Sequence, residues 1–219
     1  MDGFIFVSSP ADQEPPEDPP LPAHPNTVYV QRFPDAPSID SVCVDDRGGV
    51  ELACAYLAGL GHRRIAIVTG QMETLSGQVR LEAFSHWMHT KGFDVPHGYI
   101  IPGDFKLESG QRAAQQLLAC DPRPTAVFVS SDLMAYTLIH TLAKAGIRVP
   151  QDVSVIGFDD LPMSELFYPR LSTIRLPNTQ LGAVAARLLL ERLANPDLPG
   201  RQITLPVELK ARDSCGSLL

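Results

Sequence analysis

The chain has 219 residues, of which 44% are hydrophobic and 20% charged, and its net charge is −7. This length can bury a substantial core, as one domain or as two lobes. The acidic balance and the dispersed Lys and Arg residues argue against nucleic-acid binding by these residues themselves. Because the sequence has neither an apolar run of about 18 residues nor a basic and then apolar N-terminus, it predicts no membrane span, no signal peptide and a cytoplasmic location.

The N-terminal part predicts strands and one long loop. A strand is expected at 2–9, and further strands are expected at 26–32 and 38–46. The segment 10–25 has too many prolines and acids for a helix or a central strand, so it is predicted to be a loop.

Strands and helices alternate in the rest of the chain. Helices are predicted at 47–60, 77–91, 109–119, 132–146 and 178–194, and strands at 63–70, 98–101, 124–131, 153–158 and 202–208. Strands that are apolar throughout, between helices of this length, predict an α/β fold with parallel sheets covered on both faces.

Polar residues follow three of the predicted strands. They are Asp45-Asp46, Ser130-Ser131-Asp132 and Asp159-Asp160. In open α/β sheets ligands bind at the carboxyl ends of the strands, so this edge is the predicted binding edge. Asp46 and Asp132 also stand where helices begin and could cap them, and both roles remain open for these two. Asp159 precedes no clear helix, which favours ligand contact.

Motifs for catalysis, metals and cofactors are absent from the sequence. It contains no nucleophile elbow, phosphate-binding loop or H-E-x-x-H helix. The four cysteines have no C-x-x-C spacing, and His86 and His89 have no third ligand nearby in sequence. The sequence therefore predicts a protein that is not an enzyme and has no metal or cofactor.

Six segments carry a resemblance to a known family. They are "DDRGGVELACAYLAGLGHRRIAIVTG" (45–70), "RLEAF" (80–84), "GDFKLESG" (103–110), "PTAVFVSSDLMAY" (124–136), "AGIRVPQDVSVIGFDD" (145–160) and "PRLSTIRLP" (169–177). In order and spacing they resemble the effector-binding core of the LacI/GalR family of transcriptional regulators.

The resemblance implies a periplasmic-binding-protein-like fold of type I, with two lobes that enclose a small polar effector, sugar-like or purine-like. The N-terminal lobe would comprise 1–62 and 177–207, and the C-terminal lobe 63–176 and 208–219. The helix-turn-helix headpiece and the first part of the N-terminal lobe have no counterpart before residue 2, so the first lobe is expected to be incomplete. A homodimer is implied, with DNA contacted only through the headpiece that this chain lacks.

The resemblance also implies ligand-binding residues. Arg80 matches an arginine that contacts the effector, Phe105 an aromatic residue that stacks on it, and Asp159 an acid that accepts its hydrogen bonds. Ser131 stands where family members usually have Asn. Gln31 and Arg32 stand where Asp-Arg is common, and Leu176 falls where some sugar-binding members have Gln. From the residues alone, a solvated helix arginine and a buried loop phenylalanine are the competing interpretations.

Three other functions remain open. A solute-binding protein of a transport system has the same fold, although no signal peptide is predicted. An enzyme could use Asp159 or Asp132 as a base, but no nucleophile or cofactor motif accompanies them. A fragment could dimerise with longer relatives without binding effector.

Overall fold

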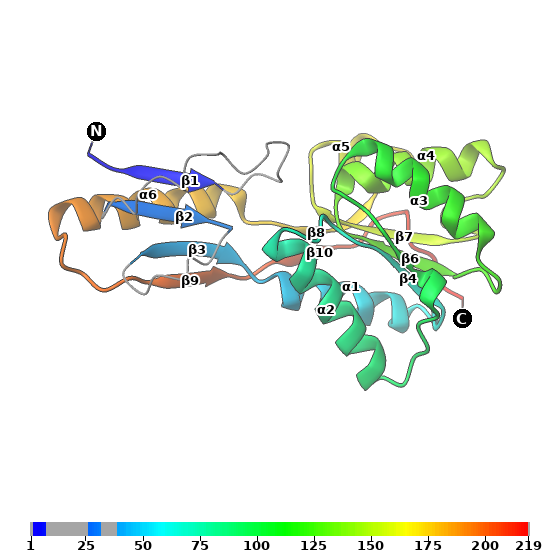
Figure 1. Cartoon of the computed structure of the whole chain (residues 1–219). Helices are drawn as coiled ribbons and strands as arrows, with labels where there is room; N and C mark the ends of the chain where they lie inside the picture. The colour runs from blue at the N-terminus through cyan, green and yellow to red at the C-terminus, as the bar shows by residue number, and fades with distance from the viewer. Residues whose placement is uncertain (1, 8–25, 32–38, 219) are drawn as a thin grey trace. The chain divides into compact units, whose positions relative to one another are not determined.

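The structure is a computed structural model that describes residues 2–7, 26–31 and 39–218 (Figure 1). It divides into two compact units, and each is described by itself. Unit 1 comprises 1–45 and 177–206, and unit 2 comprises 46–176 and 207–219. No helix in the described ranges is long and apolar enough to cross a membrane.

Unit 1 is a parallel sheet with one helix. The sheet has four strands in the order β1-β2-β3-β9, and their bounds are Phe4–Val7, Thr27–Val30, Asp40–Val44 and Gln202–Leu205. Helix α6, Asn178–Ala194, packs against β1, β2 and β3 (Figure 1). At the end of the strand order, β1 leaves Ile5, Phe6 and Val7 exposed, so this edge of unit 1 has apolar surface in contact with water.

A buried ion-pair network joins the elements of unit 1. The fully buried carboxylate of Asp40, on β3, accepts hydrogen bonds from the guanidinium of Arg192 at 2.9 Å and from that of Arg201 at 3.1 Å. Burial pulls the pKa of Asp40 upward, but the hydrogen bonds from these two arginines lower it overall. A buried carboxylate is stable only with such partners, so this network holds α6 and the start of β9 to the middle of the sheet.

Unit 2 is a larger sheet with helices on both faces. The strand order is β10-β8-β7-β6-β4-β5, and every pair is parallel except β10 with β8. The strands are β4 Ile65–Val68, β5 Ile100–Ile101, β6 Ala126–Val129, β7 Ser154–Asp159, β8 Ser172–Arg175 and β10 Glu208–Lys210. The helices are α1 Asp46–Gly59, α2 Leu75–Thr90, α3 Leu107–Ala119, α4 Asp132–Lys144 and α5 Met163–Leu166, with a 3-10 turn at His97–Tyr99.

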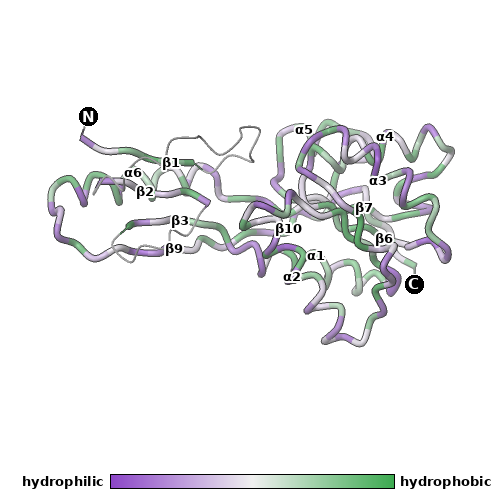
Figure 2. Tube along the Cα trace, in the orientation of Figure 1, coloured by the Kyte–Doolittle hydropathy of each residue, from purple (hydrophilic) through white to green (hydrophobic). Residues whose placement is uncertain are grey.

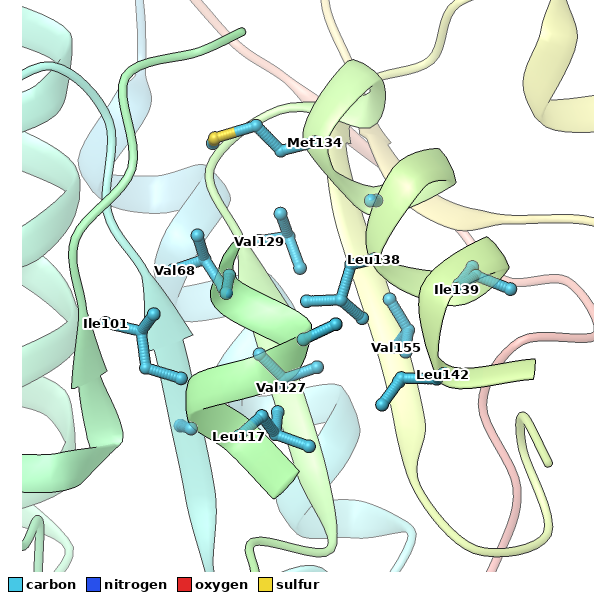
Figure 3. Close-up of a cluster of buried hydrophobic side chains, with 14 of the residues drawn as sticks. Val68, Ile101, Leu117, Val127, Val129, Met134, Leu138, Ile139, Leu142 and Val155 are labelled. Carbon is cyan, nitrogen blue, oxygen red and sulfur yellow. The ribbon is translucent and has the colours of Figure 1, made fainter. Parts of the chain in front are cut away.

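Strands β4 and β6 are apolar at every position because both faces of the sheet are covered. Along β6, Val127 and Val129 point into a core with α3 and α4, which Figure 3 shows in close-up. The alternate residues Ala126 and Phe128 point into a second core with α1 and α2. The hydrophobic stretches along β6 and β7 are visible in Figure 2. The predicted α/β class with parallel sheets is therefore confirmed.

The boundary between the units differs from the one predicted. Helix α1 falls within 1–62, which was assigned to the N-terminal lobe, but it lies in unit 2. Its apolar face, including Val50 and Leu57, is buried in the second core. A Cβ on Gly49 would lie 2.8 Å from the ring of Phe158, so the absence of a side chain there lets α1 approach the sheet closely. Burial of this face against the sheet of unit 2 is the physical reason for the difference.

Three short elements were not predicted. They are α5, β8 and β10. Strand β10 adds an antiparallel edge to a sheet that was expected to be parallel, and it pairs Leu209 with Ile174.

Candidate functional site

The predicted binding edge of unit 2 is formed by the loops that follow four adjacent strands. In the sheet order β7-β6-β4-β5 these loops begin after Asp159, Val129, Val68 and Ile101. The structure brings Arg80, Phe105, Ser131 and Asp159 to this edge, from segments up to 79 positions apart in sequence. All four residues belong to unit 2.

Arg80 lies in the second turn of α2 and is buried among three partners. Its Nε donates to the carboxylate of Asp46 at 2.7 Å, and its Nη1 donates to the carbonyl oxygen of Ser130 at 2.5 Å. The guanidinium carbon lies 3.7 Å from the ring centre of Phe158, a cation–π contact. The interpretation of Arg80 as a solvated helix arginine is therefore wrong. The side chain is fixed at the binding edge before any ligand arrives.

Phe105 lies over the loop after β4. A Cβ on Gly70 would come within 2.0 Å of the Phe105 ring, so only glycine allows the ring to lie against this backbone. The ring centre is 5.7 Å from the guanidinium carbon of Arg80. Phe105 is partly buried and packs against the α3–α4 core, so one part of the ring is anchored while another part remains accessible to a flat apolar ligand surface.

Asp159 ends β7 and has an altered acidity. Burial raises the pKa of its carboxyl group to about 7, and the nearby carboxylates of Asp132 and Asp46 push it in the same direction. The positive charge of Arg80 and a hydrogen bond from the backbone N–H of Asp132 oppose this rise. The direct hydrogen bonds of Arg80 go to Asp46 and to Ser130. At pH 7 the carboxyl group of Asp159 is therefore partly protonated and partly ionised.

Backbone strain is concentrated at the same places. Among the described residues four that are not glycine have a positive φ, and they are Gln31 (61°), Phe105 (66°), Asp159 (131°) and Asp160 (56°). Each such residue costs about 1–3 kcal/mol unless its surroundings impose the conformation, and such strain is typical of ligand sites. Three of the four belong to the predicted site, and all four follow or end a strand at its carboxyl end.

Ser131 has a structural task that the resemblance did not reveal. Its hydroxyl accepts a hydrogen bond from the backbone N–H of Met134 at 3.3 Å and so caps α4. Within the described residues, the hydroxyl of the fully buried Ser130 has no hydrogen-bond partner, and neither does the side-chain oxygen Oε1 of Gln71 after β4. Buried polar atoms without partners are costly, so Ser130 and Gln71 are further candidates for ligand contact. The polar run after β6 pointed to Ser130, but nothing in the sequence pointed to Gln71.

Asp132 and Asp160 are engaged within unit 2. The carboxylate of Asp132 is fully buried and accepts hydrogen bonds from Thr173, from Ser164 and from the backbone of Leu161, at 2.6, 2.7 and 2.9 Å. Asp160 forms ion pairs with Arg175 at 2.5 Å and with Arg212 at 2.7 Å. Asp132 therefore neither caps α4 nor reaches solvent, and Asp160 fixes the loop after β7.

Gln31 and Arg32, the two predicted ligand-binding residues of unit 1, are considered apart from the residues at the edge of unit 2. The side chain of Gln31 accepts a hydrogen bond from the backbone N–H of Val44 at 3.2 Å, which ties the end of β2 to the end of β3. Arg32 lies outside the described residues. A ligand role for Gln31 and Arg32 stays a prediction.

The charged groups of the described ranges include no cluster of three or more His, Cys, Asp or Glu side chains that could hold a metal ion. What the edge offers is a fixed guanidinium, an aromatic face, a carboxyl group and hydroxyl groups. These groups bind a ligand by hydrogen bonds and stacking.

Comparison with known proteins finds one matching family model and similar transcriptional repressors. Residues 54–215 match the family model of the periplasmic binding protein-like domain. The ribose operon repressor of Escherichia coli (strain K12) is 35% identical over 201 residues, which cover 87% of this chain and 61% of the repressor. The HTH-type transcriptional repressor PurR of Photobacterium profundum is 36% identical over 191 residues, which cover 87% of this chain and 57% of that protein.

A solved structure agrees with these relatives. A LacI family transcriptional regulator from Enterococcus faecium with bound ribose is 31% identical, with a TM-score of 0.80, and the match covers 88% of this chain and 71% of that chain. The chain thus spans about three fifths of the length of the two repressors. All three relatives are regulators by name, which favours regulation over solute transport.

Proposed function

Because the chain belongs to the LacI/GalR family of transcriptional regulators, through its periplasmic-binding-protein-like domain, we propose that it is the effector-sensing core of such a regulator. The observation that carries the proposal is the group at the carboxyl edge of unit 2, where Arg80, Phe105 and Asp159 meet and two of these three residues have a strained backbone. Strain and an uncommon pKa at one edge are typical of binding sites. The effector is a small polar molecule, sugar-like or purine-like.

The charges at this edge favour an uncharged effector with many hydrogen-bond donors. Arg80, which could attract an anion, is already neutralised by Asp46 at 2.7 Å. The remaining group, Asp159, accepts hydrogen bonds when ionised and repels a phosphate. We therefore favour a neutral sugar or nucleobase over its phosphorylated counterpart.

Binding is proposed to bias the arrangement of the two units. In a complete regulator this bias passes to a DNA-binding headpiece as a coupling free energy of about 1–3 kcal/mol. We propose no DNA contact for the 219 residues themselves, in keeping with their charge of −7. A cytoplasmic location is part of the same proposal.

Isothermal titration against a panel of neutral sugars and nucleobases tests the effector proposal. We expect one class to bind, and we expect Phe105→Ala to weaken that binding about tenfold, because a stacked ring contributes roughly 1.5 kcal/mol. Leu107→Ala is the matched control, since Leu107 is an exposed apolar residue two positions away. If Phe105→Ala and Leu107→Ala leave the same affinity, Phe105 does not contact the effector.

We also propose a homodimer, with an apolar surface of unit 2 in the interface. The surface comprises Leu133 at the start of α4, Met163 and Leu166 of α5, and Tyr168, and the last two are 78% and 91% exposed. Helix α5 is held on α4 by a hydrogen bond of 2.8 Å between the hydroxyls of Ser164 and Tyr136. Exposed apolar surfaces on a fixed scaffold are typical of protein interfaces.

Sedimentation equilibrium tests the dimer. Tyr168→Asp is expected to shift the protein from dimer to monomer, because it places a charge in a desolvated interface. Leu190→Asp, at an exposed apolar position on α6 of unit 1, is the matched control and is expected to remain dimeric. A monomeric parent protein, or dissociation only in the Leu190 variant, would contradict this surface assignment.

A further inference from the structure

Unit 2 has a hollow at the edge of its sheet where the parallel strands begin, opposite the edge that carries the proposed effector site. It has a volume of about 600 Å³. Its walls are the entry loops of three adjacent strands, with Arg64 before β4, Arg123 before β6 and Arg148 before β7. None of the residues predicted to bind effector lines it. The hollow and the proposed effector site lie at opposite ends of β4, so they are distinct sites.

Three arginines from three loops line one hollow, and in the described part of the chain only Arg148 forms an ion pair, although the charge of Arg123 also acts on Asp152. Arg148 is neutralised by Asp152 through two hydrogen bonds of 2.9 Å, and these bonds lower the pKa of Asp152 to about 2. Arg64 donates from Nε to the carbonyl oxygen of Arg123 at 3.1 Å, which orients it and leaves its two terminal nitrogens available. The hollow is therefore positive in a chain whose net charge is −7.

We propose that this hollow is a binding site for a phosphate group. Guanidinium groups present paired N–H donors whose spacing matches two oxygens of a phosphate. Arg64 and Arg123 supply these donors, and Arg148 supplies the third wall. The ligand is either free phosphate or the phosphate group of a small organic molecule.

A competing role for the arginines is structural. Helix α4 ends at Lys144, next to this edge, and cations near the end of a helix compensate its dipole. The same dipole disfavours an anion, so the arginines must outweigh it for phosphate to bind. Measurements of thermal stability and of phosphate affinity in an arginine variant distinguish the two roles.

The test is a titration of the whole chain with inorganic phosphate at constant ionic strength, followed by amide NMR. We expect a Kd of about 1 mM or tighter and shifts confined to residues 64, 123–125 and 146–152. Arg123→Gln is expected to weaken binding about tenfold, while Arg187→Gln, an exposed arginine of α6 in unit 1, leaves it unchanged. Phenyl phosphate and phenol form a second arm. Tighter binding of the ester than of free phosphate, with no binding of phenol, assigns the site to an organic phosphate.

Three results would overturn the proposal. The first is the absence of shifts at these residues up to about 50 mM phosphate, a range that detects even weak binding. The second is shifts confined to the carboxyl edge, at 130–132 and 159. The third is an Arg123→Gln variant that loses thermal stability with unchanged phosphate affinity, which would assign the arginines to the helix dipole.

Discussion

Asp132→Ala lowers the free energy of unfolding of unit 2 by roughly 3–5 kcal/mol, the loss expected when several buried hydrogen bonds to a charged group are broken. The carboxylate of Asp132 accepts from two hydroxyls and one backbone N–H, and burial raises its pKa. A Cβ on Gly157 would come within 2.3 Å of this carboxylate, so the fold leaves room there for Asp132. Alanine would leave the donors of Leu161, Ser164 and Thr173 without their acceptor.

Two variants show whether the loss comes from these hydrogen bonds. Glu108→Ala removes an exposed acid from the first turn of α3, as Asp132 belongs to the first turn of α4, and is expected to cost less than about 0.5 kcal/mol. Asp132→Asn keeps the shape of the side chain and one acceptor oxygen, and the hydroxyl of Thr173 can rotate to accept a hydrogen bond from the new amide group. We therefore expect a loss of about 1 kcal/mol in the free energy of unfolding. Urea unfolding followed by circular dichroism measures all three. Equal losses for Asp132→Ala and Glu108→Ala would show that Asp132 acts only on the helix dipole.

Strands β4 and β6 of unit 2 were predictable because they are apolar on both faces. Runs such as Ala126–Val129 admit one interpretation when helices lie between them. The place of α1 was not predictable. Its apolar face shows that the helix packs on a sheet but not on which one, and the answer depends on Gly49 and Phe158, which are far apart in sequence. Short elements such as α5 and β10 carry too few residues for any periodicity.

The binding edge was predictable as a place, but the state of its side chains was not. Acids after β7 and serines after β6 marked the edge, and the family resemblance added Arg80 and Phe105. The pairing of Arg80 with Asp46 joins residues 34 positions apart, and capping by Ser131 depends on where α4 begins. Such partners are fixed by tertiary distances, so the sequence could not distinguish a ligand-binding arginine from one already neutralised.

Asp159→Asn separates the binding role of this residue from its cost to the fold. Its folded pKa of about 7 lies above the ordinary value of 3.8. The raised pKa contributes stability that is fully present below the unfolded pKa and is lost as the pH rises through about 7. At about pH 8 the wild type therefore carries an ionised carboxylate at a partly buried position, and the asparagine variant should be more stable by roughly 2 kcal/mol once screening by solvent is allowed for. This difference should vanish below about pH 3, where Asp159 is protonated in both the folded and the unfolded state. Thermal unfolding across this range needs no effector and measures it directly.

Effector affinity is expected to change with pH in the opposite direction. The ionised Asp159 accepts hydrogen bonds from the effector, and protonation removes an acceptor, so affinity of the wild type should fall about tenfold from pH 8 to pH 6. The charged groups that face Asp159 are Arg80 of α2, Asp132 of α4 and Asp46 of α1, and burial also raises the pKa of Asp132. Asp159→Asn should bind weakly at both pH values, with no such dependence. Titration of the neutral ligand found in the panel into the wild type and into Asp159→Asn, at pH 8 and at pH 6, measures this dependence. A tenfold pH dependence that persists in the asparagine variant would assign the titrating group to another residue and remove Asp159 from the site.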